Sequence, residues 1–219
     1  MAKSKIIKEL ANNEISMEVA LNRLLIIASD IDNEELSEWA SSELHGYKQS
    51  EVFPAYRQIK STQFIYSGIN GSFQVTNVPF TYLPILQEIV PDIIDLQIGD
   101  SISTLQGFLD NSDSYSYCRD YSYLNDYVYG KTGIQCTRII QCVPLNYLQN
   151  IMSEIKTRLL KVLIKLDKEF GSLDDLDVNT ESKTPEEIER INSIVNNYIY
   201  VDNSVKIGDK NRIDNTNFR

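Results

Sequence analysis

The only histidine of the chain, His45, is the first side chain to consider for catalysis. A serine–histidine–aspartate triad would have to use it. Ser41 and Ser42 lie about one turn before it on a predicted helix, and Glu43 is close to it in the sequence. However, a histidine at the C-terminal end of a helix also complements the helix dipole. We therefore interpret His45 as a structural residue.

The three cysteines, Cys118, Cys136 and Cys142, offer a second kind of nucleophile. One of them could pair with His45, but nothing in the spacing supports such a pair. Cys136 and Cys142 alternate with isoleucines, as small core side chains do, and no C-x-x-C pair occurs. Because the number of cysteines is odd, we expect free thiols in a reducing cytosol, with no disulfide framework and no zinc site.

The sequence contains no pattern for a nucleotide or metal site: no glycine-rich dinucleotide fingerprint, phosphate-binding loop, H-E-x-x-H or EF-hand. The acidic run Asp174-Asp175-Leu176-Asp177 could collect a divalent cation. Such a run is more typical of a solvated linker. We therefore predict no cofactor and no bound metal ion.

Six of the 13 tyrosines fall within residues 113–129, in pairs two residues apart, and each pair lies near an aspartate. Three interpretations stay open. The rings could stack on nucleobases or sugars, pack half-buried across a two-stranded ribbon, or form a protein-contact surface. Strand preferences favour the ribbon, and the aspartates would repel phosphate. The candidate contact residues here are Tyr117, Tyr123 and Tyr129.

Composition limits the class of protein. The chain has 219 residues and a formal net charge of -10, with 42% hydrophobic and 24% charged residues, which excludes global disorder. No apolar stretch approaches the roughly 18–20 residues of a membrane span, and the opening residues lack the apolar core of a signal peptide. We expect a cytoplasmic protein with no membrane partner. Its negative charge disfavours non-specific nucleic-acid binding.

Three short helices are predicted within the first 46 residues. Ser16 can cap the second helix. Asp32 followed by Glu35 resembles a capping box at the start of the third. Gly46 stands where a glycine commonly ends a helix. The helices should form a cap on the rest of the domain.

Strand patterns follow this helical cap. A β-hairpin is predicted over residues 56–79, and the Gly-Ile-Asn-Gly run at 68–71 has the chemistry of its turn. Apolar residues alternate again over residues 134–142, which predicts a strand with one buried face. Arg138 interrupts that face and needs a partner if the strand is central.

Two helices are expected to supply the core. The strongest periodicity predicts a helix from Pro144, a first-turn residue, to Gly171. On the third N-terminal helix, Trp39 shares a face with Leu36 and Leu44 and should anchor the cap to the rest of the domain. The predicted buried stripe of the long helix is Leu148, Ile155, Leu159, Val162 and Leu166.

The residues after the long helix divide into a linker and a tail. Residues 172–197 are acidic and polar, with a short helix from Thr184 to about Asn196. In residues 198–219, β-branched residues recur every six positions, as in β-solenoids. One such coil cannot bury its own apolar side, so we expect the tails of several copies to pair and form a homo-oligomer. The candidate interface residues of the tail are Val201, Ile207, Ile213 and Phe218.

Together these elements predict an α+β fold. It has a helical N-terminal cap, a small, mostly antiparallel sheet, a long C-terminal helix and a short β-rich tail. The predicted domains are 1–171 for the α+β unit, 172–197 for the acidic linker and short helix, and 198–219 for the tail.

A run of residues through the first 57 positions carries a recognisable pattern: Leu24-Leu25-Ile26-Ile27-Ala28, Asn33-Glu34-Glu35-Leu36, Trp39, Glu43-Leu44, Gly46-Tyr47, Pro54 and Tyr56-Arg57. It continues at Asn77-Val78-Pro79, Ile102-Ser103-Thr104-Leu105 and residues 157–170. Over about residues 4–171 the chain resembles the AbiTii domain of abortive-infection phage-defence proteins. The resemblance implies an intracellular bacterial defence role that arrests the infected host. It implies no known reaction and carries over no catalytic residue.

Two functions stay open at this point. One is a binding or self-assembling sensor or effector module, with a phage or host protein as a candidate partner. The alternative is an enzyme-type toxin, a nuclease or other hydrolase, with carboxylates and Arg57 or Arg138 in a cleft around a metal. Sequence-specific DNA binding is disfavoured by the net charge and by the lack of a helix-turn-helix glycine pattern between Ser16 and Leu44.

Overall fold

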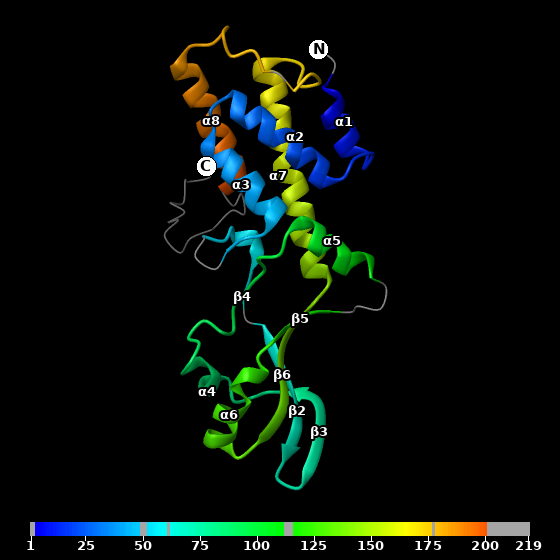
Figure 1. Cartoon of the computed structure of the whole chain (residues 1–219), viewed down its shortest axis with the longest axis vertical. Coiled ribbons are helices and arrows are strands. Elements are labelled where there is room, and N and C mark those ends of the chain that lie inside the picture. The colour runs from blue at the N-terminus through cyan, green and yellow to red at the C-terminus, as the bar shows by residue number, and fades with distance from the viewer. Residues whose placement is uncertain (1–2, 49–51, 61, 112–115, 177, 201–219) are drawn as a thin grey trace, which may run out of the picture.

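The computed structural model describes residues 3–48, 52–60, 62–111, 116–176 and 178–200. The molecule is elongated, with helices gathered at one end and a sheet at the other (Figure 1). The predicted α+β class, with a helical N-terminal part, a small antiparallel sheet and a long helix, is confirmed. Four predicted contact residues lie outside the described residues: Val201, Ile207, Ile213 and Phe218.

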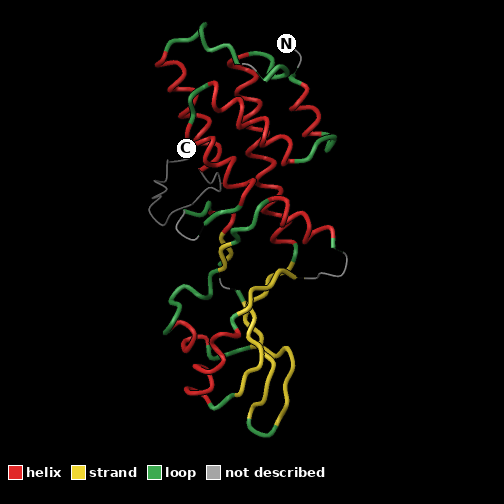
Figure 2. The backbone as a smooth tube through the Cα atoms, viewed as in Figure 1, coloured by secondary structure: helices red, strands yellow, loops and turns green. Residues whose placement is uncertain are grey.

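The helical part is built around the long helix α7, Asn146–Phe170 (Figure 2). The predicted stripe of α7 is fully buried, with 0% exposure at Leu148, Ile155, Leu159, Val162 and Leu166. The helix begins later than predicted because Pro144 is the last residue of a strand. It packs with α1 Lys5–Ala11, α2 Met17–Asp30, α5 Ile102–Asp110 and α8 Pro185–Tyr200, and α8 also contacts α3 Glu34–His45.

Side-chain caps set several helix starts. The Ser16 hydroxyl accepts a hydrogen bond from the Val19 amide at the start of α2, as predicted. The predicted capping box at Asp32 is wrong by one residue. Asn33 is the cap, and its side chain accepts from the Leu36 amide. Asp32 has φ 52°, so its backbone is left-handed and unsuited to the extended conformation of a cap residue.

The sheet part contains an antiparallel sheet with strand order β3-β2-β6-β5. Helices α4 and α6 and the 3-10 turn η2 cover one face around a second core that includes Phe64, Leu86, Val128 and Ile139. A short pair, β1 with β4, lies at the junction with the helices. The bounds are η1 Ala55–Arg57, β1 Gln58–Ile59, β2 Gln63–Asn70, β3 Phe73–Pro79, α4 Leu83–Gln87, β4 Leu96–Gln97, β5 Ser116–Asp120, η2 Ser122–Leu124, α6 Asn125–Thr132 and β6 Gln135–Pro144.

The β2–β3 hairpin forms as predicted, but its turn lies closer to the C-terminus. Asn70 pairs with Phe73, so the turn is Gly71-Ser72. Gly68 instead lies inside β2, at an irregularity in the pairing with β6. An added Cβ at Gly68 would lie 2.1 Å from the Gln135 carbonyl oxygen, so close packing of two strands requires glycine there.

The same irregularity decides the position of Arg138. β6 is central, and Ser67 pairs with Arg138 while the next residue, Gly68, pairs with Cys136. This extra residue in β6 shifts the alternation of side chains, and Arg138 is exposed. The expectation that Arg138 interrupts a buried face is therefore wrong.

The tyrosine segment is only partly a strand. β5 pairs with β6, but the predicted two-stranded ribbon is wrong for residues 122–129, which lie in η2 and α6. Leu124 and Val128 explain this difference. They are four residues apart, 3% and 0% exposed, and both belong to the second core, a spacing that favours a helix over a strand.

The cysteines depart from the expected free thiols. Cys118 and Cys142 are paired opposite each other on β5 and β6 and form a disulfide. Directly opposed residues of antiparallel strands are close enough for such a bond, and here the Cα atoms are 4.2 Å apart. Only Cys136 has a free thiol; it is buried, and burial raises its pKa. The expectation of free thiols is therefore wrong for two of the three cysteines.

Candidate functional site

The three predicted contact tyrosines occupy different environments. Tyr117 is 7% exposed. Its ring packs against Phe108, and its hydroxyl donates to the Asp100 carboxylate at 2.7 Å. Tyr123 and Tyr129 are 70% and 58% exposed. Only the latter two present a ring to solvent, and they stay predicted contact residues.

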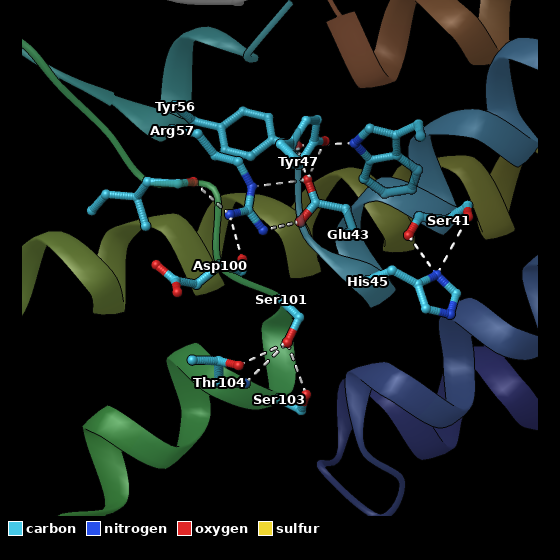
Figure 3. A network of polar contacts seen from close by, with 12 residues as sticks. Ser41, Glu43, His45, Tyr47, Tyr56, Arg57, Asp100, Ser101, Ser103 and Thr104 are labelled. Carbon is cyan, nitrogen blue, oxygen red and sulfur yellow. Dashed lines mark hydrogen bonds and ion pairs between the residues drawn. The ribbon is translucent and has the colours of Figure 1, made fainter. Parts of the chain in front are cut away.

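His45 is the last residue of α3 and is exposed. Its Nδ1 lies 3.0 Å from the carbonyl oxygen of Ser41 and 3.4 Å from the Ser41 hydroxyl (Figure 3). Both contacts stay within its own helix. The position at the C-terminal end of α3 is the one expected for a structural histidine.

The most concentrated group of polar side chains lies at the junction of the helical and sheet parts. Glu43 of α3 and Arg57 of η1 form an ion pair in which both side chains are 0% exposed. Arg57 Nη2 donates to Glu43 Oε2, and Nε donates to Oε1 at 3.3 Å. Arg57 Nη1 donates to the carbonyl oxygens of Ile98 and Asp100 at 2.8 and 2.9 Å (Figure 3).

Two tyrosines complete the coordination of the Glu43 carboxylate. The hydroxyls of Tyr47 and Tyr56 both donate to Oε1, the former at 2.8 Å. Trp39 Nε1 in turn donates to the Tyr56 hydroxyl at 2.9 Å. Trp39 is 1% exposed, so its predicted burial is confirmed. We call Trp39, Glu43, Tyr47, Tyr56 and Arg57 the junction network.

The electrostatics of the junction network keep its two tyrosines neutral and Arg57 charged. Burial, reinforced by the Glu43 carboxylate, raises the pKa of Tyr47 and of Tyr56 well above the usual value for tyrosine. Both phenols are therefore neutral donors. Burial alone would lower the pKa of Arg57, but the charge and hydrogen bonds of Glu43, together with Tyr47 and Tyr56, outweigh burial and raise that pKa. Arg57 is therefore a charged guanidinium beside Glu43.

Further contacts connect the junction network to helix α8. The guanidinium of Arg158, on α7, lies over the Tyr56 ring, 4.7 Å from its centre. Its Nη1 donates to the carbonyl oxygens of Tyr198 and Ile199 at the end of α8, at 3.1 and 3.3 Å. Cationic donors commonly satisfy the last carbonyls of a helix in this way. The position of α8 is thus linked to that of Tyr56.

A groove of about 1100 Å³ lies beside the junction network. Its walls come from α2, α3, Tyr47, residues 52–55 and the end of α8. The walls are mixed: apolar and aromatic side chains alternate with three serines and Glu38. The lining residues are Leu25, Ser37, Glu38, Trp39, Ser41, Ser42, Tyr47, Val52, Phe53, Pro54, Ala55 and Tyr200.

The junction network is suited to structure more than to acid–base chemistry. A carboxylate accepts about four hydrogen bonds. Glu43 receives four, three at Oε1 and one at Oε2, and its side chain is 0% exposed. A general base needs an accepting position directed at substrate. Within the described residues, no three His, Cys, Asp or Glu side chains gather as metal ligands would, and no helix is long and apolar enough to cross a bilayer.

The family model AbiTii matches residues 4–192. The chain belongs to the AbiTii family. Membership suggests a role in abortive-infection phage defence. The match confirms the resemblance and extends past residue 171 into α8. Neither the curated proteins nor the solved structures gave a match. The domain boundaries predicted within this AbiTii protein stay predictions.

Sequence reasoning named Arg57 as a candidate but missed its partners. Glu43 and Tyr47 are four residues apart on or beside α3, and Tyr56 adjoins Arg57. All of them, with Trp39, belong to the run that resembles the AbiTii pattern. That shared membership was a signal in the sequence that these residues meet in space.

Proposed function

We propose that this AbiTii protein acts in abortive-infection defence, in the bacterial cytoplasm, as a binding and self-assembling module that leads to arrest of the infected cell. The observation that carries the proposal is the junction network. The junction residues belong to the AbiTii pattern and bond to one another, and Trp39, Glu43 and Arg57 are at most 1% exposed, so their chemistry supports the fold. Contact with a partner then falls to exposed side chains and to the tail.

Two parts of the chain are the proposed contact elements. The exposed rings of Tyr123 and Tyr129 are large and rigid, as residues at protein interfaces commonly are. The tail, residues 201–219, is the proposed element of homo-oligomer assembly because its β-branched rhythm needs neighbouring strands. A phage or host protein is the proposed trigger or target.

The experiment compares phage plaquing and host survival in cells that express variants of the full chain. The exposed Tyr123→Ala/Tyr129→Ala variant should lose protection while keeping its thermal stability. Arg138→Ala removes a charge from the exposed face of β6 and should protect as well as the wild type. Loss of protection by a stably folded Arg138→Ala variant would instead favour the enzyme-type toxin.

A further inference from the structure

The β2–β3 hairpin differs from the rest of the chain in charge. Residues 61–87 contain no Asp, Glu, Lys or Arg, although charged residues make up 24% of the sequence. The hairpin forms the end of the molecule farthest from the helical part built around α7 (Figure 1). Near its tip, Phe73 is 75% exposed and Ile69 is 44% exposed. An uncharged surface with exposed apolar side chains is typical of a contact site.

The outer strand of this hairpin also offers backbone hydrogen-bonding groups. β3 is first in the order β3-β2-β6-β5, and within the described residues no strand pairs with its outer side. In an antiparallel pair, alternate residues direct their N–H and C=O groups away from the partner strand. The left-handed Asn77, with φ 51°, and Pro79 interrupt this edge, and the pairing with β2 is irregular between Val75 and Val78, so the regular part of the edge is Phe73–Val75.

The two edge strands of the sheet differ in charge. Edge strands are commonly protected from pairing by charged side chains. β5, at the opposite edge, carries Arg119 and Asp120. β3 carries no charge. Its side chains at Gln74 and Thr76 are exposed and neutral, so no charge along Phe73–Thr76 repels an approaching strand.

We propose that the β3 edges of two copies of this chain pair antiparallel about a two-fold axis. Each copy has a formal net charge of -10, so two copies repel each other over most of their surface. The uncharged hairpin is the region where they can meet without opposing carboxylates. A strand edge related by a two-fold axis pairs antiparallel with itself, which makes the surface self-complementary. The contact goes beyond the assembly proposed for the tail and needs none of its residues.

The test uses the full chain and measures its mass in solution over micromolar concentrations by sedimentation. Gln74→Lys/Thr76→Lys places like charges on both edges and should weaken the dimer by about tenfold or more. The matched control is Gln149→Lys/Thr157→Lys, which adds the same charge at exposed positions of α7. It should leave the dimer unchanged. Thermal unfolding checks that both variants are folded.

A second readout does not depend on added charge. Thr76→Cys should give a covalent dimer with a short bismaleimide, whereas Thr157→Cys should not. Equal crosslinking of both would overturn the contact, as would a monomeric wild-type chain. If assembly persists in Gln74→Lys/Thr76→Lys but is lost on removing residues 201–219, the hairpin contact is wrong and the tail proposal stands. If assembly is lost in Gln74→Lys/Thr76→Lys but persists after removal of residues 201–219, the hairpin contact is supported and assembly through the tail is wrong.

Discussion

Arg57 of η1 reaches Glu43 of α3 across the junction of the two parts, and neither side chain has any exposure to solvent. The pair has a single arrangement because the Ile98 and Asp100 carbonyls hold the other side of the guanidinium. A buried ion pair does not by itself add much stability, but breaking it leaves an uncompensated charge. Removing one partner of the pair should therefore cost more stability than the intact pair provides.

Arg57→Met should lower the free energy of unfolding by about 3–5 kcal/mol, because it leaves the Glu43 carboxylate buried without its cation. Urea unfolding measures the change. Lys60→Met is the control, since Lys60 is 67% exposed and pairs with Asp95 at the surface. The loss there should be within about 1 kcal/mol. An equal loss of unfolding free energy in both variants would show that the buried ion pair stabilises the fold no more than a surface pair does.

Tyr117 predicts a loss of stability at alkaline pH. Burial and its hydrogen bond to Asp100 raise its pKa to about 12, against about 10 in an unfolded chain. The folded state thus favours the neutral phenol. Its contribution is fully present below about pH 10 and is lost as the pH rises through about 12. The raised pKa values of Tyr47 and Tyr56 act in the same direction.

The measurement is the free energy of unfolding at several pH values from neutral to alkaline. Tyr117→Phe keeps the ring and removes the titrating group, so its decline above pH 10 should be shallower than that of the wild type. Tyr129→Phe, at an exposed position, is the control and should follow the wild type. Parallel curves for all three proteins would contradict the assigned role of Tyr117.

The disulfide predicts a definite thiol count. The unfolded, non-reduced chain should show one reactive thiol, that of Cys136, and three after reduction. Cys118→Ser/Cys142→Ser should lower the free energy of unfolding by about 2–4 kcal/mol, because the bond closes a loop across 24 residues. The variant should be insensitive to added dithiol, unlike the wild type. Three thiols before reduction would reject the bond.

Leu159 tests the core of the helical part. Leu159→Ala should cost about 2–5 kcal/mol, the usual range for a fully buried leucine. Ile164, on the same helix and 42% exposed, provides a control of similar size, and Ile164→Ala should cost much less. A melting temperature unchanged by Leu159→Ala would mean that this stripe of α7 is not core.

The features that could be predicted from sequence are local ones. The stripe of α7 follows from three- and four-residue spacing, and the Ser16 cap follows from one side chain and an amide three residues away. Both depend on residues close together in the chain. The hairpin was also predictable, but the position of its turn was not, because Gly68 pairs with β6 inside β2 and does not belong to the turn.

The features that were missed depend on segments far apart in sequence. Cys118 meets Cys142 only because β5 pairs with β6 in one register. Glu43 meets Arg57 only because α3 ends beside η1. In the tyrosine segment, alternation predicted strands, but burial of Leu124 and Val128 against the sheet stabilises a helix. Tertiary packing overrode local preference there.

The end of α8 determines where the tail can be removed cleanly. Ile199 is 0% exposed, and the carbonyl oxygens of Tyr198 and Ile199 accept from Arg158. A chain that ends at Asn197 lacks all three features and should be less stable than the wild type. A chain that ends at Tyr200 keeps them and should melt at the wild-type temperature. Thermal unfolding of the two truncations tests this difference.

The chain ending at Tyr200 is therefore the one that tests the tail. If residues 201–219 join subunits, this truncation should lower the mass in solution with no loss of thermal stability, because the contacts of α8 with α7 and α3 are kept. Sedimentation of both truncations beside the full chain separates loss of assembly from loss of stability. A lower mass only for the chain ending at Asn197 would assign assembly to the end of α8, and an unchanged mass for both would refute assembly through the tail.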